Sequence, residues 1–323
     1  MRSEFEKLRN GSFFAKLCYV LLLLGHWLLP TGRREAIRCW IYRVTKLRPS
    51  FCRRVKKWGL NRKSRSPLVI VSLTSYPKLI NTAHRTIETL LTQDFKPDMV
   101  ILWLADSQFP RHELDLPRKL LRLKKFGLGI RWCKDIKSYK KLIPALRLFP
   151  DEIIVTADDD MFYRPEWLGV LYKSYLQERE SVHCHYASKM KVVDGEIRPW
   201  CEWKLSARGN SSFRNSLWGG VGALYPPHVL SSEVLNEGAF DKLAPNADDL
   251  WFWLMAVRNG HRVKLADDAF CELVADWAVD KSEALMNTNV ACGKNDVQLS
   301  NILKAYPEVK SRLLEAVAET KGV

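Results

Sequence analysis

Short apolar runs alternate with longer segments of helical periodicity from residue 67 onward. Four short runs predict strands, which lie in 68–74, 99–106, 129–135 and 152–157, and residues 153–156 of the last are all β-branched. Three helical patterns separate them, in 81–93, 116–127 and 138–150. Strands that alternate with helices are typical of an α/β domain, so we expect a mostly parallel central sheet.

The punctuation of these patterns predicts where helices begin and end. Asn81 is expected to cap the first helix, and Gly127 to end the second. Pro165 suits the first position of a helix that follows the fourth strand. In the second half, helical patterns cover 246–260 and 295–307, and the strand predicted in 216–227 is interrupted by three glycines.

Polar residues stand where the predicted strands end. Thr74 and Ser75 follow the first strand, Asp135 the third, and three consecutive aspartates the fourth. In an open α/β sheet, ligands bind in the crevice beyond the carboxyl ends of the strands. We therefore expect these side chains to lie around a ligand.

The three aspartates are Asp158, Asp159 and Asp160. Adjacent carboxylates repel one another, so the arrangement is costly unless water solvates them or a cation is shared between them. Asp158 and Asp160 form a D-x-D that could hold Mn²⁺ or Mg²⁺ through hard oxygen ligands. The alternative is a solvated turn, with Asp160 as a cap of the next helix.

Two other segments carry charged residues that, with the three aspartates, would suit transfer of a sugar from a nucleotide-sugar donor. Transfer from a nucleotide-sugar donor needs a cation across the diphosphate, often a Lys or Arg, and, for inversion, a carboxylate that accepts the acceptor's proton. Lys140 and Lys141 could reach the phosphates, or they could be solvated helix residues. Asp248 and Asp249 open a late helix, where acids are also ordinary partners of the helix dipole.

Six segments in order resemble the bacterial GT-A glycosyltransferases that build lipopolysaccharide and capsule chains. The resemblance covers roughly residues 67–305. The segments read SLTSYP, SYKKLIPAL, TADDDMFYRPEWL, GGVGALYPP, ADDLWFWLMAV and NDVQL. It implies a GT-A nucleotide-sugar-binding fold and a metal-dependent, inverting sugar transfer to a lipid-linked or oligosaccharide acceptor.

The resemblance also assigns roles to residues. Asp158 and Asp160 would bind the metal, and Asp249 would be the base, with Asp248 as the other candidate because the family more often has Glu-Asp here. Thr74 and Tyr76 would lie near the base or ribose of the donor. Together with the other polar strand ends and the two lysines, the expected donor side comprises Thr74, Ser75, Tyr76, Asp135, Lys140, Lys141, Asp158 and Asp159. From the residues themselves, because glycines allow the backbone to approach a ligand, we expect an acceptor side of Gly220, Gly222 and Trp251.

Two other functions share parts of this pattern. A haloacid-dehalogenase-like phosphatase also uses a D-x-D, but places it after the first strand, whereas three predicted strands precede it here. A non-catalytic membrane- or nucleic-acid-binding protein would be driven by basic charge. Because residues 67–323 carry only +1 of the net +15 and lack an aromatic-basic stripe, we expect no nucleic-acid partner.

The positive charge is concentrated near the N-terminus. Residues 31–66 carry +12, directly after an apolar stretch whose core, Leu17 to Leu24, is shorter than a membrane span. No small-residue cleavage site follows it, which argues against a secretory signal peptide. We expect residues 1–66 to be a peripheral or monotopic anchor on anionic lipid at the cytoplasmic face of the inner membrane, and 67–323 to be the catalytic domain. A buried helix with a solvated basic linker is the alternative.

The eight cysteines are scattered, without a C-x-x-C pair or a zinc-like His spacing. This distribution is typical of reduced thiols in a cytosolic compartment.

Overall fold

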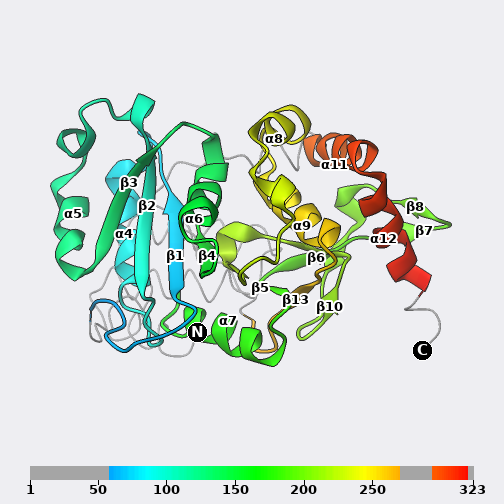
Figure 1. Ribbon diagram of the computed structural model, residues 1–323, viewed down its shortest axis with the longest axis horizontal. Coiled ribbons are helices and arrows are strands. Elements are labelled where there is room, and N and C mark those ends of the chain that lie inside the picture. The colour runs from blue at the N-terminus through cyan, green and yellow to red at the C-terminus, as the bar shows by residue number, and fades with distance from the viewer. Residues whose placement is uncertain (1–57, 270–292, 319–323) are drawn as a thin grey trace, which may run out of the picture.

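The computed structural model describes residues 58–269 and 293–318. At its centre is an eight-stranded sheet with the order β10-β13-β5-β12-β4-β1-β2-β3 (Figure 1). Its strands are β1 (Val69–Thr74), β2 (Met99–Ala105), β3 (Leu128–Cys133), β4 (Ile153–Ala157), β5 (Val182–Cys184), β10 (Ser211–Ser212), β12 (Ala223–Tyr225) and β13 (Val263–Leu265). The predicted α/β class with a mostly parallel sheet is confirmed.

Neighbouring strands β3, β2, β1 and β4 all run parallel. Their register sets Leu73 of β1 beside Leu102 of β2 and Ala157 of β4. Strand β12 then pairs antiparallel with both β4 and β5, which interrupts the parallel arrangement. The carboxyl ends of β1 and β4 therefore meet at one edge, as the sequence predicts, and this edge holds the site described below.

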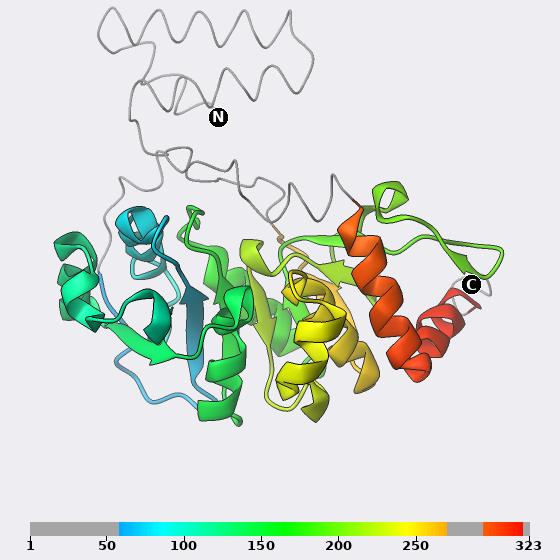
Figure 2. The same ribbon diagram turned by 90° about the horizontal axis from the view of Figure 1, so that it is seen from above.

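Helices cover both faces of the sheet (Figure 2). Successive residues of a strand point to opposite faces, so each strand contributes to two hydrophobic cores. Ile70 packs into one core, and Val69 and Val71 into the other. The Ile70 core includes residues of α6 (Ile143–Leu148), α8 (Glu237–Leu243), α9 (Asp248–Arg258), α11 (Lys294–Ala305) and α12 (Pro307–Ala318). The Val69 core includes residues of α4 (Ile80–Leu90), α5 (Arg118–Leu121) and α7 (Trp167–Gln177).

Short elements complete the body. A three-stranded sheet has the order β11 (Asn215–Leu217), β6 (Ala187–Lys189) and β9 (Lys204–Leu205), and β7 (Val192–Val193) pairs with β8 (Glu196–Ile197). The 3₁₀ helices are η2 (Asp106–Gln108), η3 (His112–Asp115), η4 (Arg122–Phe126), η5 (Lys137–Lys141), η6 (Trp200–Glu202), η7 (Gly219–Val221) and η8 (Ser232–Leu235).

Several predicted helix ends are wrong. Helix α4 begins before Asn81, with Leu79 in the capping position, and α7 begins after Pro165, with Glu166 as its cap. Pro165 therefore does not occupy the first helical position expected of it, and Asp160 does not have the capping role that the solvated-turn alternative gave it. Gly127 does end the helical segment before β3, in the left-handed conformation with φ 106° that a glycine adopts without strain.

The folded body begins before residue 67. The Trp58 ring packs against Phe126 at 4.7 Å, and the Arg65 guanidinium lies 4.3 Å from the Phe95 ring centroid. Arg65 also pairs with Asp98 at 3.0 Å. Residues 58–66, which include part of the basic block, are thus packed on the domain, while the predicted apolar anchor lies outside the described residues.

Within the residues that the structure describes, no helix is both long and apolar enough to span a membrane.

Candidate active site

In the turn after β4, the middle aspartate is buried and the other two are partly exposed. Asp159 is buried and accepts a hydrogen bond from the Ser75 hydroxyl, while its main-chain oxygen accepts one from Thr86 at 2.9 Å. Burial raises the pKa of Asp159 to about 7. Asp158 and Asp160 remain partly exposed on either side of it. Asp159 therefore anchors the turn through Ser75, and its two neighbours are the aspartates that are partly exposed to the crevice side.

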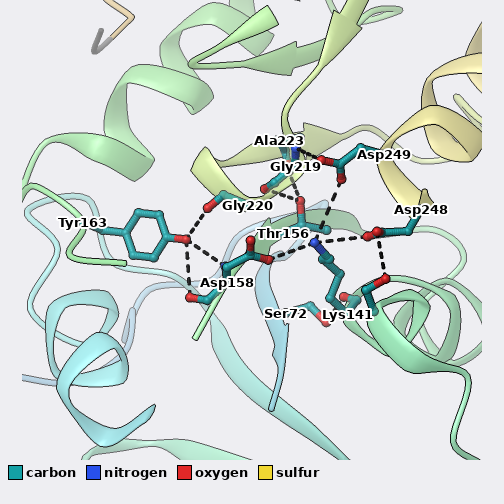
Figure 3. Close-up of polar contacts among 11 residues, drawn as sticks. Ser72, Lys141, Thr156, Asp158, Tyr163, Gly219, Gly220, Ala223, Asp248 and Asp249 are labelled. Carbon is teal, nitrogen blue, oxygen red and sulfur yellow. Dashed lines mark hydrogen bonds and ion pairs between the residues drawn. The ribbon is translucent and has the colours of Figure 1, made fainter. Parts of the chain in front are cut away.

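Asp158 is held by residues from three segments (Figure 3). Its main-chain N–H donates to the Tyr163 hydroxyl at 2.8 Å, and that hydroxyl donates to the main-chain oxygen of Gly220 at 2.5 Å. Its Oδ1 accepts a hydrogen bond from Lys141 at 2.8 Å. A Cβ on Gly220 would overlap Asp158 Oδ2, so this close approach requires glycine.

The acid pair at the start of α9 faces the same point. Asp248 is buried, and its Oδ1 accepts a hydrogen bond from Ser138 at 2.8 Å. Asp249 is less enclosed, with 36% of its side chain exposed, and its Oδ2 accepts a hydrogen bond from the main-chain N–H of Gly219 at 2.9 Å. Asp249 is therefore accessible in part, with its Oδ1 buried, while Asp248 is held inside.

Lys141 lies between Asp158 and the acid pair Asp248 and Asp249 (Figure 3). Its Nζ is 2.8 Å from Asp158 Oδ1, 3.1 Å from Asp248 Oδ2 and 4.0 Å from Asp249 Oδ1. Only 5% of its side chain is exposed. Segments separated by about a hundred residues in the sequence thus converge on one ammonium group.

The pKa values reflect this enclosure. Burial raises the pKa of Asp249 to about 7, and Lys141 opposes that rise. Burial lowers the pKa of Lys141, but the carboxylates of Asp158 and Asp248 outweigh it and hold the pKa well above its ordinary value. Lys141 is therefore charged, and Asp249 can exchange a proton near neutral pH.

The other predicted donor-side residues lie along the same edge of the sheet. The Thr74 hydroxyl donates to the main-chain oxygen of Trp103 at 2.9 Å, and 37% of Tyr76 is exposed. Lys140 is buried and pairs with Asp135 at 2.5 Å. Because both Lys140 and Lys141 are buried, the alternative of solvated helix residues is wrong.

The three predicted acceptor-side residues lie in different surroundings. Gly220 lies against Asp158, whereas Gly222, at φ 120°, packs against the Trp167 indole. Trp251 is fully buried, and its Nε1 donates to the main-chain oxygen of Val234 at 3.1 Å. Trp251 has no surface to offer an acceptor in this structure, and its role here is in the core.

A divalent cation suits this group of residues by charge and donor chemistry. Asp158, Asp248 and Asp249 surround one lysine. Asp249 Oδ1 is buried without a hydrogen-bond donor, and Asp248 Oδ2, also buried, has the Lys141 ammonium as its ion-pair partner at 3.1 Å. Within 58–269 and 293–318, no cluster of three or more His, Cys, Asp or Glu is arranged to hold a metal. A cation on Asp158 and Asp160 would therefore need further oxygen ligands, such as phosphate oxygens or water.

Sequence reasoning missed three residues that shape the site. Tyr163 ties Asp158 to Gly220, Ser138 bonds to Asp248, and Thr156 donates to the main-chain oxygen of Gly219 at 3.2 Å. All three stand within or beside the quoted motifs. Their partners are distant in sequence, so no local pattern indicates the contacts.

No protein-family model and no curated protein matches this chain. Among solved structures, the mannosyltransferase PcManGT from Pyrobaculum calidifontis, in complex with GDP-Man and Mn²⁺, has a TM-score of 0.49 and 14% identity, covering 94% of this chain and 80% of that chain. S. aureus TarS 1–349 has a TM-score of 0.45 and 17% identity, covering 76% of this chain and 70% of that chain. At such low identities and scores, the function of this chain must be argued from its own site.

Proposed function

We propose that this chain is a metal-dependent glycosyltransferase that moves a sugar from a nucleotide-sugar donor to an acceptor hydroxyl. The observation that carries the proposal is the convergence of Asp158, at the end of β4, with Asp249, at the start of α9, across Lys141. Asp158, a proposed ligand of the cation, thus lies near Asp249, the carboxyl group proposed to accept a proton.

On the donor side, Asp158 and Asp160 would hold Mn²⁺ or Mg²⁺. The bound cation would neutralise charge that develops on the leaving diphosphate. Ser75 and Asp159 keep the turn between the two ligands in place. Thr74, Tyr76 and Asp135 would contact the donor from the neighbouring strand ends, and the buried Lys140 would hold Asp135 in place.

On the acceptor side, Asp249 is the base. It is partly exposed, and the Gly219 N–H fixes its Oδ2, while its Oδ1 is buried. The exposed part of this carboxyl group would accept the proton of the sugar hydroxyl. A pKa of about 7 suits a general base at neutral pH. A base on the acceptor hydroxyl supports direct displacement, and hence inversion at the donor carbon.

The acceptor and the location rest on the sequence. The six quoted segments resemble enzymes of lipopolysaccharide and capsule synthesis, so the acceptor is a growing surface glycan, lipid-linked or oligosaccharide. The basic N-terminal block favours attachment to anionic lipid at the cytoplasmic face of the inner membrane.

The test is a screen of nucleotide sugars against the full chain in detergent, with and without Mn²⁺. One donor should raise the thermal midpoint with Mn²⁺ present, because ligand that binds only the folded state stabilises it by mass action. Asp160→Ala should lose this metal-dependent shift while it keeps the midpoint of the free protein. No stabilisation by any nucleotide sugar or nucleoside diphosphate, or transfer that persists in excess chelator, would refute the proposal.

A further inference from the structure

Two consecutive buried hydrogen bonds hold the main chain at Lys141. The Trp103 indole N–H donates to the Ser72 hydroxyl at 3.0 Å, and that hydroxyl donates to the main-chain oxygen of Lys141 at 2.6 Å. Ser72 and Trp103 lie on β1 and β2, in the central part of the sheet. The main chain of Lys141 is therefore held by two central strands of the sheet.

The tip of the same side chain is set by carboxylates from two other elements. Asp158 comes from the end of β4, and Asp248 and Asp249 come from the first turn of α9. The ammonium group has three hydrogens, and its two nearest neighbours are Asp158 and Asp248, at 2.8 and 3.1 Å. With the side chain enclosed, little of it is left to reach a diphosphate in the crevice.

We propose that Lys141 is a positioning residue that fixes the base Asp249 relative to the metal-side carboxylate Asp158. The inference rests on the proposed function and replaces the expected phosphate contact of Lys141 with an internal one. Lys141 draws Asp158 and Asp248 toward one point, and Asp249 follows because it is the next residue of the same helical turn.

The two roles predict different losses for Lys141→Met. A phosphate ligand stabilises the bound donor, so its removal weakens nucleotide binding. A positioning residue acts through Asp249, so its removal lowers kcat. A displacement of about 1 Å in a reacting group can cost on the order of 10²-fold in rate.

The experiment is a double-mutant cycle in the full chain. With Mn²⁺ present, Lys141→Met should lower kcat about 10²-fold and change the Kd of UDP or GDP, whichever stabilises the wild type, by less than about threefold. In an Asp249→Asn background the same change should cost almost nothing further, because the group it positions is already inactive. Additive losses, or nucleotide binding weakened tenfold or more, would overturn the proposal.

Lys140→Met is the matched control. Lys140 is the neighbouring lysine and is as deeply buried, but it pairs with Asp135 rather than with the acid pair. Its loss should combine additively with Asp249→Asn. Non-additivity for both lysines would indicate a general effect of removing buried charge, and would count against a specific role for Lys141.

A binding measurement with Mn²⁺ alone is independent of turnover. Lys141→Met removes a positive charge 2.8 Å from a proposed metal ligand, so Mn²⁺ should bind the variant as tightly as the wild type or more tightly. If Lys141→Met does not fold, Lys141→Met/Asp248→Asn removes one excess negative charge and takes its place in the same measurements. Weaker binding of Mn²⁺ alone would contradict the arrangement.

The Lys141 contact can also be tested if the proposed function is wrong. If the wild type transfers no sugar, urea unfolding decides whether the contact itself holds. Lys141→Met should lower the unfolding midpoint, and adding Asp248→Asn should restore part of that loss, because fewer carboxylates are then left without a partner. Purely additive losses of midpoint would show that Lys141 does not connect the two groups.

Discussion

At the scale of single residues, Asp249 is subject to two opposing effects. The start of a helix favours its anion, but burial disfavours it, and burial prevails, with a pKa raised to about 7. Because a base works in its deprotonated form, kcat should fall as the pH drops through about 7, rather than near 4 as for an ordinary aspartate.

Asp249→Asn keeps the shape of the side chain but cannot accept the proton. We expect kcat to fall by about 10²- to 10⁴-fold, with binding of the donor retained. Asp248→Asn should cost less, since Asp248 is buried against Ser138. A residual rate that still follows a pKa near 7 in Asp249→Asn, or a retained anomeric configuration in the product by NMR, would contradict this assignment.

Gly220 supports the metal side through its lack of a side chain. Alanine at this position would overlap Asp158 Oδ2 and displace the carboxylate. Gly220→Ala should therefore weaken Mn²⁺ binding at least about tenfold, a loss of roughly 1.4 kcal/mol. Gly238→Ala is the matched control, because a Cβ there lies 3.6 Å from its nearest neighbour, Asn236 Oδ1, and it should leave Mn²⁺ binding unchanged. Equal effects of the two changes would contradict a specific contact at Gly220.

At the scale of elements, α9 both carries the acid pair and fills the core. Residues Leu250 to Val257 are all buried. Trp251→Ala should lower the free energy of unfolding by about 3–5 kcal/mol, as is usual for a buried tryptophan. Urea unfolding measures this loss. A cost below about 1 kcal/mol, with acceptor KM raised instead, would return Trp251 to the acceptor side.

The sequence predicted the elements of the central sheet better than their ends. Strand β4 could be predicted because a β-branched run buried on both faces has few alternatives. Asn81 was a poor guide, because the cap position of α4 is Leu79, two residues earlier, and it makes no side-chain cap hydrogen bond. The predicted helix around Lys141 is a 3₁₀ turn followed by α6, with Leu142 between them. That turn aims Lys141 inward, which helical periodicity could not indicate.

The residues of the site were also easier to predict than their contacts. Asp158 and Asp249 were chosen because acids at strand and helix ends suit a ligand site. That Lys141 would lie between them depends on pairings across about a hundred residues, which a single sequence does not encode locally. The same limit explains why Tyr163 was missed.

At the scale of the whole molecule, charge is divided between two parts. Residues 1–66 carry +14 of the net +15. Electrostatic attraction to a surface is screened within roughly 8 Å at physiological salt. Binding of the full chain to anionic vesicles should therefore weaken as salt rises, and neutral vesicles should bind it less. Sedimentation that does not respond to salt or to lipid charge would contradict an electrostatic contribution.

The position of the domain boundary yields the last prediction. Trp58, Asn61 and Arg65 contact the α/β body, so a chain that begins at residue 58 keeps these contacts, and one that begins at residue 67 loses them. Both should lose vesicle binding, but the shorter chain should melt at least about 4 °C lower, since 1 kcal/mol shifts Tm by roughly 2–4 °C in a domain of this size. Equal melting temperatures would show that residues 58–66 add no stability. A chain that begins at residue 58 and still sediments with anionic vesicles would place a membrane-binding surface on the α/β body itself.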